Sequence, residues 1–123
     1  MRWGFIGASN IAERISPSLR KIAGQELVAV CSRSAPRAQQ FAEQQGLASA
    51  HTDLSELLAL GLDAVYISST NEQHAAQTLA ALDAGCHVMC EKPLAMSLAD
   101  AAAMIERAEA RGRALGTNHH LRA

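Results

Sequence analysis

Short apolar runs alternate with segments of helical periodicity along the whole chain, and this alternation restricts the fold more than any other feature. The apolar runs are nearly continuous rather than alternating with polar residues, as in strands that are buried on both faces. We expect strands near residues 3–6, 27–31, 48–51, 63–68, 87–90 and 113–117. We expect helices near residues 10–23, 35–45, 53–60, 72–84 and 98–111. This order predicts an α/β protein with a doubly wound parallel sheet of about six strands and helices on both faces.

Local signals mark where several of these helices begin and end. A glycine follows each of the five helical segments, as is common at helix C-termini. Pro17 lies inside the first helical segment and predicts a kink or an interrupted turn. Glu56 follows Asp53 by three residues, which suggests a capping box. Asp53 and Ser97 are expected to cap the helices that follow them, and Ser34 precedes the second helical segment.

Composition excludes several classes of function. The chain has 123 residues, of which 49% are hydrophobic, and a net charge of −1. This size fits one domain over residues 1–123, and the composition argues against disorder. A charge this close to zero argues against binding of nucleic acid, which needs a basic excess. The longest apolar runs fall short of the roughly 20 residues that span a bilayer, so we expect no membrane partner.

The three cysteines are interpreted as structural. Cys31, Cys86 and Cys90 each lie in or beside an apolar run. That position is typical of reduced core thiols in a cytoplasmic protein. No second pair of ligands accompanies Cys86 and Cys90 at a metal-binding spacing, so we expect no metal site.

A turn between the first strand and the first helix has the form of a dinucleotide-binding fingerprint, G-x-G-x-x-G/A. Gly7 stands at its first glycine and Ala12 at its last small position. Ser9 replaces the second glycine, and its hydroxyl could bond a phosphate. In this strand–turn–helix context we expect backbone N–H groups at the helix start to hold a pyrophosphate. The residues predicted to form this cradle are Gly7, Ala8, Ser9, Asn10 and Ile11.

The end of the second strand carries the signal for the type of cofactor. NAD-binding proteins place an acidic residue here to accept bonds from the ribose hydroxyls. This chain has no acid here and instead places a hydroxyl and two guanidinium groups in Ser32, Arg33 and Arg37. Arginine binds phosphate in a bidentate fashion, so we expect NADP(H) in preference to NAD(H). The alternative is a solvated loop with ordinary arginines.

Three further polar segments follow strands at the edge of the sheet where ligands of α/β proteins bind. They are residues 68–74, 91–93 and 117–122. The first could equally be a helix start that leaves His74 on the surface, and Lys92 could be an ordinary exposed lysine. The adjacent histidines His119 and His120 would point to opposite faces of a strand, which disfavours a shared metal.

Taken together, these segments resemble the N-terminal part of Gfo/Idh/MocA oxidoreductases, with Glu91-Lys92-Pro93 as the most specific motif. The resemblance implies a Rossmann-type NADP(H)-binding domain of a sugar-ketone reductase, with Lys92 as the catalytic group at the substrate oxygen. It also implies that Ser32, Arg33 and Arg37 meet the 2′-phosphate. The positions that it places along the ribose and nicotinamide are Ser69, Thr70, Asn71, Glu72, His74, Glu91, Lys92 and Asn118.

Members of this family continue into a second domain that completes the substrate pocket, so we expect this chain to be a truncated cofactor domain. It should bind cofactor and turn over little or no sugar-like substrate. Two alternatives stay open. One is a non-catalytic nucleotide-binding or regulatory module, which does not account for Lys92 in its Glu-Lys-Pro setting. The other is a structural fragment that binds no nucleotide and self-associates through a surface that the second domain would cover.

Overall fold

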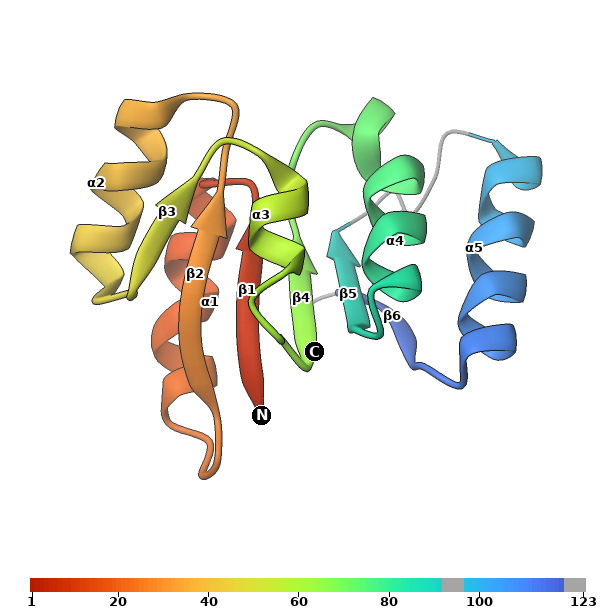
Figure 1. The fold of residues 1–123 in the computed structure, drawn as a ribbon, viewed down its shortest axis with the longest axis horizontal. Helices are drawn as coiled ribbons and strands as arrows, with labels where there is room; N and C mark the ends of the chain where they lie inside the picture. Colours follow the sequence, from red (N-terminus) through yellow and green to blue (C-terminus); the bar gives the residue numbers. More distant parts are fainter. Residues whose placement is uncertain (92–96, 119–123) are drawn as a thin grey trace.

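The fold is built on one sheet of six parallel strands in the order β3-β2-β1-β4-β5-β6 (Figure 1). The computed structural model describes residues 1–91 and 97–118. The sheet confirms the predicted Rossmann-type α/β architecture. Its strands are β1 (Arg2–Ile6), β2 (Glu26–Cys31), β3 (Ser49–His51), β4 (Ala64–Ile67), β5 (His87–Glu91) and β6 (Leu115–Asn118).

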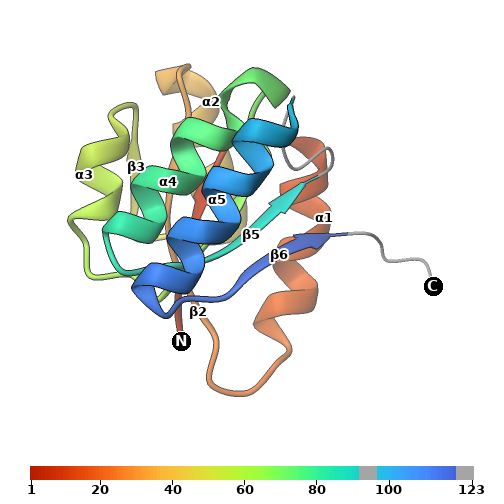
Figure 2. The ribbon, with the colours of Figure 1, turned by 90° about the vertical axis from the view of Figure 1, so that its right-hand side faces the viewer.

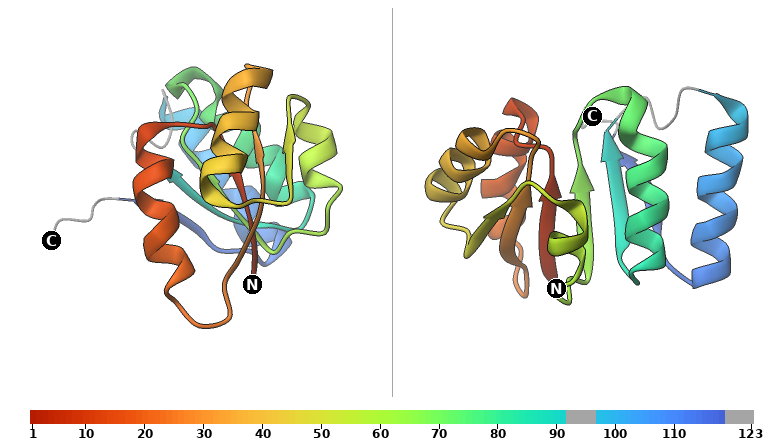
Figure 3. Two further views of the ribbon diagram at one scale, coloured as in Figure 1. Left: turned by 90° about the vertical axis from the view of Figure 1, so that its left-hand side faces the viewer. Right: turned by 45° about the horizontal axis from the view of Figure 1, so that its top comes forward.

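Five α-helices in the described residues cover the two faces of the sheet. Apolar residues of α1 and α2 pack on one face, and those of α3, α4 and α5 pack on the other. Figure 2 shows α1 on one side of the sheet and α3, α4 and α5 on the other. The left panel of Figure 3 shows the molecule from the β3 edge, with α1 and α3 on opposite sides of the sheet. The helices are α1 (Asn10–Arg20), α2 (Ala35–Gln45), α3 (Leu54–Leu58), α4 (His74–Asp83) and α5 (Leu98–Arg111).

Helices with strong local signals begin and end where the sequence predicts. The hydroxyl of Ser34 accepts a hydrogen bond at the start of α2, and that of Ser97 does so at the start of α5. Gly46 and Gly112 end these two helices in the left-handed conformation, with φ of 68° and 64°. These caps satisfy backbone groups that a helix leaves without partners at its ends.

Other helix boundaries differ from the prediction. Helix α1 continues through Pro17 without interruption and ends at Arg20 instead of near residue 23. The predicted helix over 72–84 divides into a 3₁₀ turn, η1 (Asn71–Gln73), and α4. No side chain caps α4, since Gln73 at its start is already helical in φ and ψ. The tighter 3₁₀ turn instead satisfies the Gln73 N–H, which donates to the Thr70 carbonyl at 3.0 Å.

The capping box predicted at α3 forms only in part. The Asp53 carboxylate accepts from the backbone and hydroxyl of Ser55 rather than from the Glu56 amide. The Glu56 carboxylate lies 3.3 Å from Nδ1 of His51, which is at the end of β3. Helix α3 is five residues long, shorter than the predicted segment.

In three loops that follow strands, the first residue is hydrogen-bonded through its backbone to the neighbouring strand. The Gly7 N–H donates to the Cys31 carbonyl at 2.8 Å, and the Ser68 N–H donates to the Ile6 carbonyl at 2.8 Å. The Ser32 N–H donates to the His51 carbonyl at 2.9 Å. The hydrogen-bond ladder of the sheet thus extends past the carboxyl ends of β1, β2 and β4.

None of the helices in the described part of the chain is long and apolar enough to cross a membrane.

We expect Phe41→Ala to destabilise the domain strongly. Phe41 is fully buried between α2 and the sheet, where its ring centroid lies 5.4 Å from that of Phe5. Removing a buried aromatic ring costs about 3–5 kcal/mol of unfolding free energy through lost contacts and the cavity left behind. Urea unfolding followed by circular dichroism measures this loss. Ile105→Ala is the control, because Ile105 is 48% exposed, and a loss as large as that of Phe41→Ala would contradict the assignment of the core.

Candidate functional site

A groove of about 550 Å³ lies at the carboxyl edge of the sheet, where β1, β2, β3 and β4 end. Its volume is within the range of small-molecule sites, and its position is the one where α/β sheets bind ligands. The structure brings together seven of the residues predicted for the cofactor site. They are Gly7, Ala8, Ser9, Ser32, Arg33, Ser69 and Thr70.

Gly7 lets two loops approach each other at the floor of this groove. Its φ is +104°, a value that side chains of L residues rarely adopt. A Cβ atom here would lie 2.8 Å from the Ser69 nitrogen and 2.9 Å from the Ser68 carbonyl carbon. Only glycine therefore allows the turn after β1 to touch the turn after β4.

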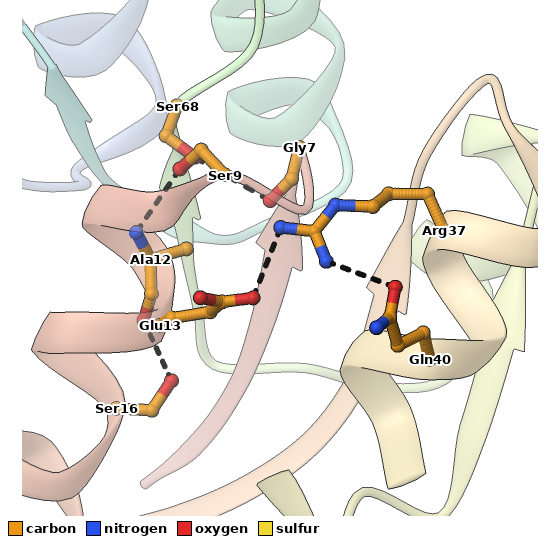
Figure 4. A network of polar contacts seen from close by, with 8 residues as sticks. All are labelled: Gly7, Ser9, Ala12, Glu13, Ser16, Arg37, Gln40 and Ser68. Carbon is orange, nitrogen blue, oxygen red and sulfur yellow. Dashed lines mark hydrogen bonds and ion pairs between the residues drawn. The ribbon is translucent and has the colours of Figure 1, made fainter. Parts of the chain in front are cut away.

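Ser9 caps helix α1 and ties it to the neighbouring loop. Its hydroxyl accepts from the Ala12 N–H at 3.0 Å and donates to the Ser68 hydroxyl at 2.7 Å (Figure 4). The Ser9 hydroxyl thus already has partners inside the domain. The N–H groups of Asn10 and Ile11 belong to the first turn of α1, where a helix supplies no carbonyl to accept them. They remain available as donors at the positive end of the helix dipole.

The two predicted arginines have different surroundings. Arg33 lines the groove, whereas Arg37 is not among the lining residues. Nη2 of Arg37 lies 2.9 Å from a carboxylate oxygen of Glu13, and Nη1 lies 3.4 Å from the Gln40 amide oxygen (Figure 4). Glu13 therefore compensates the charge of Arg37.

Neutral and cationic groups line the groove in the described part of the chain. No Asp or Glu is among these lining residues. At the end of β2 the lining consists of Ser32, Arg33 and Ser34. A phosphate group would meet no anionic repulsion here, and a guanidinium is present to bind it.

The loop after β4 is supported from beneath by His74. This residue is 1% exposed, and its Nε2 lies 3.0 Å from the Ser69 carbonyl oxygen. Its imidazole is thus inside the protein and does not line the groove. The Ser69 hydroxyl donates to the amide oxygen of Gln77 on α4. Glu72 is exposed outside the groove, and Asn71 begins η1.

The ends of β5 and β6 place two further predicted residues next to each other. Glu91 and Asn118 are the last residues of their strands and are register partners. The Glu91 carboxylate accepts a hydrogen bond from the hydroxyl of Tyr66, which is buried in β4. Glu91 does not line the groove beside β1 and β2. Lys92 lies outside the described residues.

Some residues of the groove were not predicted from the sequence. Thr52 and Leu54 line it from the segment after β3, and Gln77 lines it from α4. The carboxyl end of β3 lies at the same edge as those of β1 and β2, so the topology could have indicated Thr52. Gln77 follows Gln73 by one helical turn, and this spacing could have indicated that both face the groove.

The cysteines are buried and unpaired, as expected. Burial raises the pKa of Cys90 to about 11, and burial also raises the pKa values of Cys31 and Cys86. No cluster of three or more metal-binding side chains occurs in residues 1–91 and 97–118.

Comparison with known proteins identifies the family of the chain. The Gfo/Idh/MocA model, described as an oxidoreductase family with an NAD-binding Rossmann fold, matches residues 1–119. The chain belongs to this family. It is an NAD(P)-binding Rossmann domain, and the predicted family and fold are confirmed.

Individual relatives span a range of redox enzymes. The 1,5-anhydro-D-fructose reductase of Ensifer adhaerens is 49% identical over 98% of this chain and 37% of its own length. The D-glucoside 3-dehydrogenase of Escherichia coli K12 is 41% identical over 99% of this chain and 35% of its own length. A crystal structure of the K102A mutant of KijD10, a 3-ketoreductase from Actinomadura kijaniata in complex with TDP-benzene and NADP, superposes with a TM-score of 0.90. It is 34% identical and covers 98% of this chain and 40% of its own. The chain thus spans little more than a third of the length of these relatives.

Gly7→Ala should destabilise the domain more than an alanine at another positive-φ glycine. The Cβ at residue 7 would collide with backbone, whereas a Cβ at Gly24, which has a φ of +84°, would meet no atom within 4 Å. The conformational penalty alone is about 1–2 kcal/mol and applies to both variants. We expect Gly7→Ala to lose roughly 2 kcal/mol more unfolding free energy than Gly24→Ala, because backbone must move. Equal urea midpoints for the two variants would contradict the close contact of the loops.

The cysteines should be unreactive in the folded domain. A raised pKa keeps a thiol protonated, and alkylation requires the thiolate. At about pH 8, we expect iodoacetamide to modify all three slowly in buffer and rapidly in denaturing urea. Mass spectrometry counts the modified thiols. Rapid labelling of Cys90 in the native protein would contradict its burial.

Proposed function

We propose that this chain is the cofactor domain of a reductase that uses NADPH to reduce the carbonyl group of a sugar-like ketone. The observation that carries the proposal is the groove at the end of β2, which has Arg33 and no carboxylate among its described lining residues. The identity to a 1,5-anhydro-D-fructose reductase supports the class of substrate, and the NADP in a superposable 3-ketoreductase supports the cofactor.

The N-terminal end of α1 would bind the pyrophosphate. Gly7 and Ala8 leave room for the backbone to approach it, and the first-turn N–H groups of Asn10 and Ile11 supply donors. The Ser9 hydroxyl maintains this arrangement through the Ala12 N–H and the Ser68 hydroxyl. In this assignment Ser9 orders the cradle instead of donating to phosphate.

The end of β2 would bind the adenosine 2′-phosphate. Ser32 and Arg33 lie on the groove and offer a hydroxyl and a guanidinium. Arg37 would join them only by exchanging its ion pair with Glu13 for one with the phosphate. Arg33 is therefore assigned the larger share of the preference for NADPH.

The nicotinamide end would lie toward β4, β5 and β6. Ser69 and Thr70 line the groove on this side, and Glu91 and Asn118 end the next two strands at the same edge. When bound, reduced nicotinamide supplies a hydride to the substrate carbon. Lys92, adjacent to Glu91 in the sequence, would place its ammonium at the substrate oxygen and donate the proton that this oxygen gains.

The chain by itself is proposed to bind cofactor without appreciable turnover, because positioning of the substrate provides much of the catalytic power of an enzyme. The unpaired, buried cysteines accord with the proposed reducing, cytoplasmic location.

A titration with NADPH and NADH, followed by nicotinamide fluorescence, tests the cofactor assignment. We expect NADPH to bind at least about tenfold more tightly, because a charge-assisted hydrogen bond contributes about 1.5–3 kcal/mol. Arg33→Ala should remove most of this difference, and Arg37→Ala should remove less of it.

Three other outcomes would contradict parts of the proposal. Equal affinities would refute the preference for NADPH. Turnover of 1,5-anhydro-fructose by the 123-residue chain at the rate of a full-length relative would refute the requirement for further residues. No binding of either cofactor, together with a mass that rises with protein concentration, would favour a self-associating structural fragment.

A further inference from the structure

Arg33 reaches across the mouth of the groove to Gln73. Arg33 extends from the segment after β2, and Gln73 is the last residue of η1, which follows β4. The Gln73 amide is oriented with its oxygen toward Arg33, because the opposite orientation would set donors against donors. Its oxygen then accepts from Nε of Arg33 at 3.0 Å and from Nη2 at 2.5 Å.

This contact leaves the phosphate-binding edge of the guanidinium free. A guanidinium carries five N–H donors in a fixed plane. Gln73 takes the Nε–H and one N–H of Nη2, which form the side edge of the group. The Nη1 and Nη2 donors at the outer edge remain, and this pair matches the bidentate geometry of a phosphate.

The contact also leaves the charge of Arg33 uncompensated. Gln73 is neutral, and no carboxylate forms an ion pair with Arg33 within the described ranges. Arg37 provides the contrast, because Glu13 holds it with a full negative charge 2.9 Å away. A neutral acceptor fixes the direction of the guanidinium without weakening its attraction for an anion.

We propose that Gln73 is a specificity-determining positioning residue that holds Arg33 across the groove with its outer edge directed at the 2′-phosphate of NADP(H). The inference rests on the proposed function, since it requires a dinucleotide in this groove. An exposed arginine samples many rotamers, and fixing it in one orientation before binding lowers the entropic cost of forming the phosphate contact. NADH lacks the 2′-phosphate, so its affinity should not depend on this orientation.

The test measures dissociation constants for NADPH and NADH in the wild-type chain, Gln73→Leu and Gln73→Glu. Gln73→Leu removes the acceptor, and we expect NADPH to bind about fivefold more weakly while NADH changes less than about twofold. Gln73→Glu keeps an acceptor but adds a negative charge beside Arg33. We expect it to weaken NADPH binding by about tenfold or more, again with little effect on NADH.

Two controls separate positioning from an effect on folding. Gln39→Leu makes the same change on α2, where Gln39 is exposed and hydrogen-bonded to Glu43, and should alter neither affinity. In an Arg33→Ala background, Gln73→Leu should have no further effect on NADPH, because the group that it positions is gone. Thermal melting by circular dichroism checks that each variant is folded.

Each result bears on the inference. An equal loss of NADPH and NADH affinity in Gln73→Leu, a loss that persists without Arg33, or tighter binding of NADPH would overturn it. If the wild-type chain prefers NADPH and Gln73→Leu does not alter that preference, only this inference fails. If the wild-type chain binds neither cofactor, the proposed function fails and this inference fails with it.

Discussion

The contact between the turn after β1 and the turn after β4 is the constraint on which the rest of the site depends. Gly7 makes it possible, because any Cβ there would lie within 3 Å of the backbone of Ser68 and Ser69. The contact fixes the start of α1 against the neighbouring loop, and the hydroxyls of Ser9 and Ser68 reinforce it. The groove is therefore shaped by backbone geometry, and side chains such as Arg33 only complete its rim.

Local signals in the sequence account for much of this fold. Helices α2 and α5 match the predicted bounds because Ser34, Gly46, Ser97 and Gly112 satisfy backbone groups without help from distant residues. The strand–helix alternation predicts the parallel sheet because a chain of this composition must bury each apolar run on both faces. The 3₁₀ turn before α4 was not predictable in this way, since it depends on how the loop after β4 meets its neighbours.

In the candidate site too, features marked by short sequence motifs were predictable, and contacts between residues distant in sequence were not. Gly7 and Arg33 were predicted because fingerprints and strand ends are visible as short motifs. The burial of His74 was not predictable, since a histidine in a polar segment shows no sign of which way it will face. The ion pair of Arg37 with Glu13 joins two helices, and nothing near Arg37 in the sequence indicates Glu13.

Arg33 and Arg37, the two arginines after β2, carry the same charge but have different partners. Glu13 neutralises Arg37, and their ion pair links α1 to α2. The Arg33 guanidinium faces a neutral amide and lies on the groove. A count of basic residues in the sequence treats the two as equivalent, and only their partners distinguish them.

The extension of the sheet's hydrogen bonds past the strand ends has a thermodynamic consequence. The amides of Gly7, Ser32 and Ser68 are all bonded to a neighbouring strand, so the backbone beneath the groove is already ordered. A ligand that enters would have to immobilise side chains but little main chain, which reduces the conformational entropy lost on association. Binding to such a surface should therefore resemble the docking of two rigid bodies more than the coupled folding of a loop, with a correspondingly small change in heat capacity.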